Sequence, residues 1–161
     1  MQPPRASGIP ADGVVKVLSV GQSGEDHVFL QTVFQQSEWA LCPGSRWRLI
    51  AIPTVTSARA ALRHSRIPIV LCQCNLRTGV WQELLEQAEC LPDPPCLILT
   101  FRLGDDRLWA EALNRGAYDV LAQPYDGEEV VRILSMAWLH WNDPRKSEAR
   151  SSAPLTMASG M

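Results

Sequence analysis

The feature that most constrains the fold is an alternation of short apolar runs with helix-forming segments between residues 14 and 141. Runs such as Ile67–Cys72 and Cys96–Phe101 are apolar at almost every position, which is typical of strands buried on both faces. Helical segments between such strands let them run parallel. The pattern therefore predicts an α/β fold with a doubly wound, five-stranded parallel sheet and five helices. The expected strands are 14–20, 46–52, 67–72, 96–101 and 118–122, and the expected helices are 26–39, 57–65, 79–90, 105–115 and 127–141.

Composition divides the 161 residues into one predicted domain and two tails. Residues 1–13 hold three Pro and two Gly, and residues 142–161 are mostly small and polar. Both segments are typical of disordered tails, so we expect the folded domain at 14–141 and no separate DNA-binding or enzymatic module. No apolar run approaches the roughly 20 residues of a membrane span, and the N-terminus lacks the apolar core of a secretory signal.

The cysteines and histidines show no spacing typical of a metal or redox site. We therefore expect reduced, mostly buried thiols in a cytoplasmic protein, with no bound metal and no cofactor. A disulfide or a metal site is the less favoured alternative. The residues concerned are Cys42, Cys72, Cys74, Cys90 and Cys96, together with His27, His64 and His140.

Parallel doubly wound sheets bind ligands at the carboxyl ends of their strands, so the residues there form the candidate site. The sequence has no glycine-rich phosphate loop, no Ser-His-Asp set and no paired carboxylates at these ends. We therefore expect no catalytic residues and no enzyme. The strand-end residues are neutral: Gly21, Gln22, Gln73, Thr100 and Gln123.

Two segments resemble the second half of a response-regulator receiver domain. They are residues 95–100 (PCLILT) and 112–125 (ALNRGAYDVLAQPY), in which Gly116 and Ala117 precede a strand and Pro124 follows it. The resemblance covers residues 14–141. It implies a flavodoxin-like strand order of 2-1-3-4-5 with five helices, and a switch operated by phosphoryl transfer.

The switch of that family needs charged residues that this sequence lacks. An Asp ending the third strand accepts the phosphoryl group, and two acidic residues after the first strand help it hold Mg²⁺. A hydroxyl after the fourth strand binds the phosphoryl group, a Lys before the Pro neutralises it, and an aromatic residue in the fifth strand reports the change. At these positions the chain has Gln73 for the acceptor, Gly21 and Gln22 for the acidic pair, Thr100 for the hydroxyl, Gln123 for the Lys and Val120 for the aromatic residue.

The loss of the acceptor does not depend on the exact register, because no Asp or Glu lies between Glu38 and Glu83. We therefore predict that the three glutamines hydrogen-bond around Thr100 and hold the pocket in one state. Glu25 and Asp26 are expected in the first turn of a helix, where the dipole favours acids. Weak cation binding by these two residues is the alternative.

The near-neutral net charge of −2 conceals two charged halves. Residues 39–82 carry six Arg and no acid (+6), and residues 83–129 carry eleven acids and three Arg (−8). Arg59, Arg63 and Arg66 are spaced to share one helix face, which fits an acidic protein or self-association. Nucleic acid is less favoured because no base-reading motif accompanies them, and an ordinary solvated surface remains open.

Aromatic residues of the second half are candidates for a partner contact. Trp109, Tyr118 and Trp141 fall in the fourth helix, fifth strand and fifth helix, which form the usual dimer or effector surface of receiver domains. Exposed aromatic residues are common interface anchors. Packing against neighbouring helices is the alternative.

The function predicted from these features is that of a stand-alone receiver-like protein in two-component signal transduction. It would lack phosphoacceptor chemistry and act by binding a protein: a histidine kinase, a separate output protein or a second copy. The alternative is a phosphorelay receiver that uses a non-standard acceptor or binds a phosphorylated partner.

Overall fold

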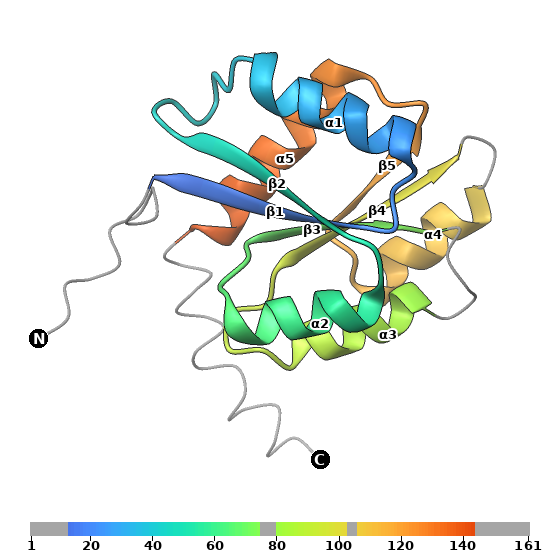
Figure 1. Cartoon of the computed structure of the whole chain (residues 1–161). Helices are drawn as coiled ribbons and strands as arrows, with labels where there is room; N and C mark the ends of the chain where they lie inside the picture. Colours follow the sequence, from blue (N-terminus) through green and yellow to red (C-terminus); the bar gives the residue numbers. More distant parts are fainter. Residues whose placement is uncertain (1–12, 75–79, 103–105, 144–161) are drawn as a thin grey trace, which may run out of the picture.

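The computed structural model describes residues 13–74, 80–102 and 106–143, and these form a single parallel sheet flanked by helices (Figure 1). The strand order is β2-β1-β3-β4-β5, which confirms the predicted fold. The strands are β1 (Val14–Val20), β2 (Arg46–Ile52), β3 (Ile69–Gln73), β4 (Cys96–Arg102) and β5 (Asp119–Gln123), and the helices are α1 (Gly24–Gln36), α2 (Val55–His64), α3 (Val80–Glu89), α4 (Asp106–Arg115) and α5 (Gly127–Trp141).

The helices cover the two faces of the sheet in separate layers. Helices α1 and α5 lie on one face, and α2, α3 and α4 lie on the other (Figure 1). Each layer has its own core, one containing Leu30 and Trp138 and the other Leu62 and Trp81. Strand β3 lies in the middle of the sheet and is buried along its whole length, as its continuous apolar sequence predicts.

The structure corrects two helix boundaries. Helix α1 ends at Gln36 rather than at Trp39, because Ser37 is extended and Trp39 instead stacks on Trp47 with ring centroids 4.0 Å apart. Helix α2 begins at Val55 rather than at Ser57 and is capped by Thr54, since the Thr54 hydroxyl accepts the Ser57 N–H at 3.1 Å.

The expected tails at 1–13 and 142–161 lie almost entirely outside the described residues, so their disorder stays a prediction. Among the helices of the described ranges, none has the length and apolarity needed to cross a membrane.

Candidate functional site

Four polar side chains predicted from the strand ends come together at the carboxyl edge of the sheet. Gln73 ends β3 and pairs in register with Thr100 of β4, while Gln123 ends β5 and Gln22 follows β1. Gln73 is only 3% exposed, and Thr100 and Gln123 are buried as well. Polar groups buried in this way need hydrogen-bond partners, and they find them in one another.

Gln73 and Gln123 form a reciprocal amide pair. Nε2 of Gln73 donates to Oε1 of Gln123 at 2.9 Å, and Nε2 of Gln123 donates to Oε1 of Gln73 at 2.9 Å. A carboxamide has both a donor and an acceptor, so two of them satisfy each other without net charge. The positions where the resemblance expects a carboxylate and an ammonium therefore hold a neutral pair.

Thr100 connects this pair to Gln22. Its hydroxyl donates to Oε1 of Gln73 at 2.9 Å and accepts a hydrogen bond from Nε2 of Gln22 at 3.0 Å. The hydroxyl is thus engaged on both sides, as donor and as acceptor. No further hydrogen is left on it for an incoming ligand unless one of these contacts breaks.

Tyr125, in the connection between β5 and α5, closes the network. Its hydroxyl donates to Oε1 of Gln22 at 2.7 Å and accepts from Nε2 of Gln123 at 3.2 Å. Burial raises the pKa of Tyr125 to about 12, so the phenol stays protonated at neutral pH. We call this closed set of side chains the amide ring: Gln22, Thr100, Gln73, Gln123 and Tyr125.

One carboxylate reaches the amide ring from outside. Asp26 lies in the first turn of α1, as predicted, where it accepts the Ser23 hydroxyl at 2.9 Å. Its Oδ2 atom also accepts a hydrogen bond from Nε2 of Gln123 at 2.8 Å. Gln123 therefore shares its amide hydrogens among Gln73, Asp26 and Tyr125.

Gly21 contributes the turn that brings Gln22 to the ring. It has a φ of 76°, the left-handed conformation that glycine adopts most readily, and its N–H donates to the Ile52 carbonyl at 3.1 Å. Gly21 has no side chain to offer a ligand. Its contribution to the candidate site is therefore the backbone turn that places Gln22 at the ring.

Asp26 and Tyr125 are the site residues that sequence reasoning missed. The sequence places Asp26 at the helix start, with weak cation binding as the alternative, and gives Tyr125 no role beyond its place in the segment 112–125. A signal for Tyr125 exists, because it stands two residues beyond the strand end that also carries Gln123. The contacts themselves join residues about a hundred positions apart, which local patterns do not show.

The arrangement is suited to holding the strand ends together rather than to group transfer. The amide at the end of β3 is a weaker nucleophile than a carboxylate would be. It also carries no charge that could attract a divalent cation. Within the described residues, no group of three or more His, Cys, Asp and Glu side chains is placed to hold a metal ion.

The three aromatic candidates for a partner contact have different environments. Trp109 on α4 is 47% exposed, and Tyr118 is half-buried beside His140, with ring centroids 5.0 Å apart. Trp141 is 6% exposed, and its Nε1 donates to the Pro94 carbonyl at 3.1 Å. The assignment of Trp141 to an exposed surface is therefore wrong, because its ring completes the core at the end of α5.

The three arginines predicted to form one basic face of the second helix lie in three different environments. Helix α2 ends at His64, so Arg66 lies beyond it, pairs with Asp93 at 3.2 Å and covers the ring of Trp141 at 4.5 Å. Arg59 pairs with Glu83 of α3 at 2.9 Å. Arg63 is exposed in the last turn of α2. The expectation that the three arginines share one helix face is wrong, because α2 ends at His64 and Ser65 is extended, so the helix stops before Arg66.

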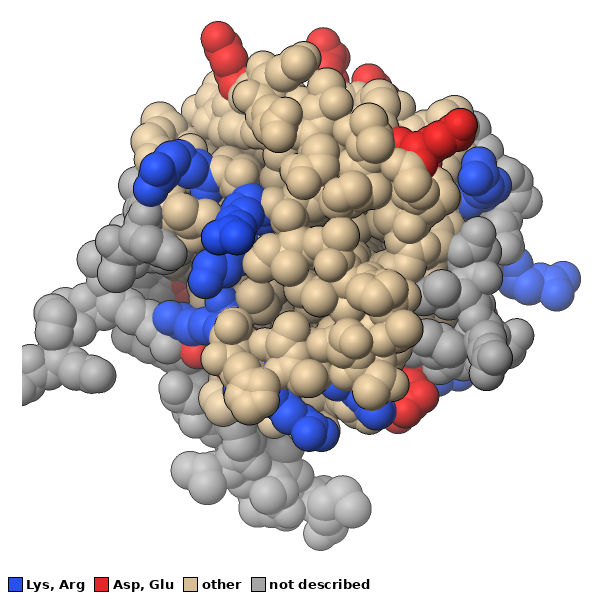
Figure 2. All heavy atoms as spheres, viewed as in Figure 1, with Lys and Arg blue, Asp and Glu red and all other residues tan. Residues whose placement is uncertain are grey.

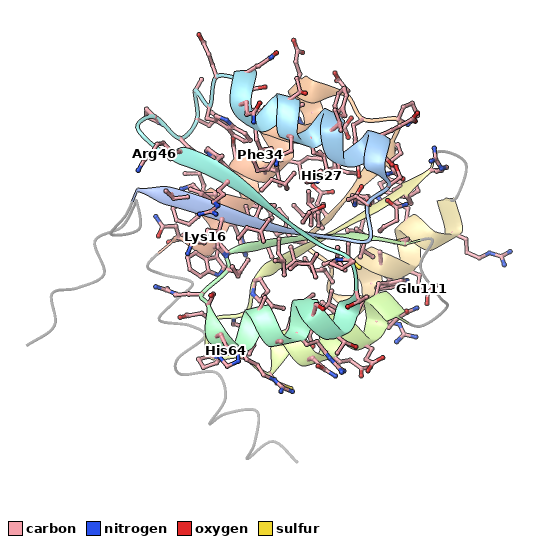
Figure 3. The ribbon with its side chains drawn as sticks, in the orientation of Figure 1. Lys16, His27, Phe34, Arg46, His64 and Glu111 are labelled. Carbon is pink, nitrogen blue, oxygen red and sulfur yellow. The ribbon has the colours of Figure 1, made fainter. Side chains whose placement is uncertain are left out.

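Charge is nevertheless unevenly distributed over the surface. In the view of Figure 2, red side chains stand mainly along the top of the molecule, and blue ones lie on the left, along the bottom and at the right edge. Lys16 and Arg46 of the neighbouring strands β1 and β2 lie on the left, and His64 lies at the lower end of α2 (Figure 3). Phe34 lies between α1 and the sheet in the same view, inside the core.

Comparison with known proteins rests on structure, since no protein-family model matches the chain and no curated protein is significantly similar in sequence. The receiver domain of an HD domain-containing protein from Pseudomonas fluorescens Pf-5 matches with a TM-score of 0.63 and 22% identity, over 79% of this chain and 96% of that one. The chain has the receiver-domain fold. A putative response regulator from Chloroflexus aurantiacus J-10-fl matches at a TM-score of 0.65 and 16% identity, over 77% and 97% of the two chains. The N-terminal receiver domain of a response regulator from Bacteroides fragilis matches with a TM-score of 0.64 and 17% identity, over 78% of this chain and 97% of that one.

Proposed function

We propose that this chain is a receiver-like protein of two-component signalling that takes no phosphoryl group and acts by binding another protein. The observation that carries the proposal is the buried Gln73–Gln123 amide pair, with both reciprocal contacts at 2.9 Å. It occupies the two positions where the resemblance implies the acceptor Asp and the Lys.

The chemistry of the amide ring supports this proposal. A carboxylate can attack a phosphoryl donor and form an acyl phosphate, whereas a carboxamide at Gln73 does not form that bond. Among the described residues, the carboxylate that contacts the ring is that of Asp26, which accepts hydrogen bonds from Gln123 and Ser23. Without a phosphoryl anion or a divalent cation there is no charge for a lysine to neutralise, which fits the neutral Gln123.

The proposed partner is a histidine kinase, a separate output protein or a second copy of the chain. Trp109 and Leu113 are exposed on α4, and large exposed apolar side chains of this kind anchor interfaces. Arg63 and the basic side chains of β1 and β2 would favour an acidic partner. Nucleic acid is not favoured, because no stacking platform or base-reading element accompanies these cations.

We place the protein in the cytoplasm and assign it no enzymatic activity and no cofactor. All five cysteines lie within the described residues and none is in a disulfide, as in proteins of reducing compartments. Burial raises the pKa of Cys72 to about 12, so this thiol is not a reactive nucleophile at neutral pH.

Phosphoryl transfer distinguishes the proposal from its alternative. The full chain is incubated with Mg²⁺ and acetyl phosphate and weighed by intact mass spectrometry, beside a receiver domain that has its acceptor Asp as a positive control. We expect the control to gain one phosphoryl group and this chain to stay unmodified. A stable phosphoryl adduct would overturn the proposal and favour a receiver with a non-standard acceptor.

A further inference from the structure

The fifth strand lacks the aromatic residue that the resemblance leads one to expect. Val120 stands at that position, half-buried against the core formed with α2, α3 and α4. Valine has no hydroxyl, so it cannot form a hydrogen bond to Thr100. Any coupling between the site and the surface must therefore use another side chain.

Tyr125 is the member of the amide ring that also has an aromatic contact with a partly exposed residue. Its hydroxyl lies inside the ring, bonded to Gln22 and Gln123. Its aromatic ring packs against Phe29 of α1, with centroids 6.2 Å apart and planes inclined by 32°. Phe29 is 40% exposed, and the neighbouring Val28 is 64% exposed. One side chain thus spans the distance from the buried network to an apolar surface.

We propose that Tyr125 couples the amide ring to the exposed apolar face of α1, formed by Val28 and Phe29. The inference rests on the proposed function, because it takes the ring to be a closed and uncharged site. Breaking the ring at Gln22 removes one of the two hydrogen bonds of the phenol, and breaking it at Thr100 releases Gln22, which holds the phenol; either change loosens the contact with Phe29. The loosened packing then affects α1 and not the α4 side of the sheet.

The contacts of the other tyrosine support this direction. Tyr118 lies at the start of β5 and contacts His140 of α5. No hydrogen bond joins its hydroxyl to the amide ring within the described residues. Trp109 on α4 also has no contact with the ring among those that the structure describes. Among the side chains that the structure describes, none on the α4 side is connected to the ring as Tyr125 is.

Hydrogen exchange of the full chain tests the coupling with a matched pair of variants. Tyr125→Phe removes one hydroxyl but keeps an aromatic ring of the same size beside Phe29, and Tyr118→Phe makes the same chemical change away from the amide ring. Losing a hydrogen bond of this kind speeds local opening by about twofold to tenfold. We expect that acceleration in α1 for Tyr125→Phe, with no change in α4 and no change in α1 for Tyr118→Phe. Unchanged exchange in α1, or equal acceleration by both variants, would overturn the inference.

A second comparison separates coupling from simple loosening. Thr100→Val breaks the ring at its buried end, and we expect it to accelerate exchange in α1 only while Tyr125 is intact. In the Tyr125→Phe background the same substitution is expected to add nothing in α1. Additive effects in the double variant would contradict the proposal. Slow exchange in β3 shows that each variant is folded, and Gln22→Ala replaces Thr100→Val if that variant does not fold.

The outcome is independent of the test of the proposed function. A phosphoryl adduct in the mass measurement would refute the proposed function. The hydrogen-exchange data would still decide whether Tyr125 couples the ring to α1. An unmodified chain with no exchange effect in α1 would refute only the coupling.

Discussion

The Gln73→Asp variant is expected to lose about 3 kcal/mol of unfolding free energy at about pH 7.5, and roughly half of that at about pH 5. Gln73 is buried, and the nearest charged group of the site, Asp26, is itself an acid that bonds to Gln123. A carboxylate placed there loses its hydration and gains no cation. Its pKa is therefore raised in the folded state.

The sign of the pH dependence follows from that shift. An acid whose pKa is higher in the folded state binds its proton more tightly there than in the unfolded chain, so folding is penalised as the pH rises from the unfolded pKa to the folded one. The loss in this variant therefore grows between about pH 4 and pH 6 and is complete above the folded pKa. Urea unfolding at both pH values measures it.

Gln73→Asn is the matched control, because it shortens the side chain by the same methylene group and stays neutral. We expect its loss to be independent of pH over this range. The difference between the Asp and Asn variants isolates the charge. An Asp variant as stable as the Asn variant at about pH 7.5 would mean that the site already tolerates a carboxylate, contrary to the closed neutral ring.

The Trp141→Ala variant is expected to lose about 3–5 kcal/mol of unfolding free energy, whereas the Trp109→Ala variant is expected to lose less than about 1 kcal/mol. Trp141 is buried, stacks on Trp138 with centroids 5.8 Å apart and donates to the Pro94 carbonyl. Arg66 also covers its ring at 4.5 Å and would lose that cation–π contact. Trp109 is half-exposed, so its removal leaves no comparable cavity.

Denaturant unfolding of the two tryptophan variants tests the correction to the predicted partner surface. Equal losses would mean that Trp141 contributes no more to the core than Trp109. Recovery of a bound partner gives a second readout, which we expect to fall for Trp109→Ala although its stability is nearly unchanged. Unchanged recovery would remove Trp109 from the proposed contact surface.

The fold was predictable because each strand is marked by its own residues. The apolar run Cys96–Phe101 reads as a buried strand without knowledge of its neighbours, and the strand order followed from the resemblance in residues 95–100 and 112–125. The errors lie at helix ends, where tertiary contacts decide. Trp39 leaves the helix pattern to stack on Trp47, which comes eight residues later.

The candidate site was only partly predictable. Gln73, Thr100 and Gln123 were found because each stands at a strand end, a position that the sequence marks. Asp26 and Tyr125 were missed because their contacts with Gln123 and Gln22 depend on how α1 and the β5–α5 connection sit over the sheet.

Two residues of the predicted partner surface, Arg66 and Trp141, were misplaced for a similar reason. Helical spacing placed Arg66 on the face of Arg59 and Arg63, but α2 ends at His64 and Arg66 turns toward Asp93 and Trp141. Trp141 was a candidate for a partner contact, with packing against neighbouring helices as the alternative. In the structure the last turn of that helix still packs in the core.

Calorimetric titration with Mg²⁺ and beryllofluoride, a mimic of the phosphoryl group, tests most directly whether the site is a closed, uncharged ring. Beryllofluoride needs a carboxylate to coordinate it and a cation beside it, and the ring presents amides and hydroxyls already bonded to one another. The account predicts no saturable heat of binding, with a receiver domain that has its acceptor Asp giving a clear signal in parallel. Saturation at micromolar beryllofluoride would contradict it.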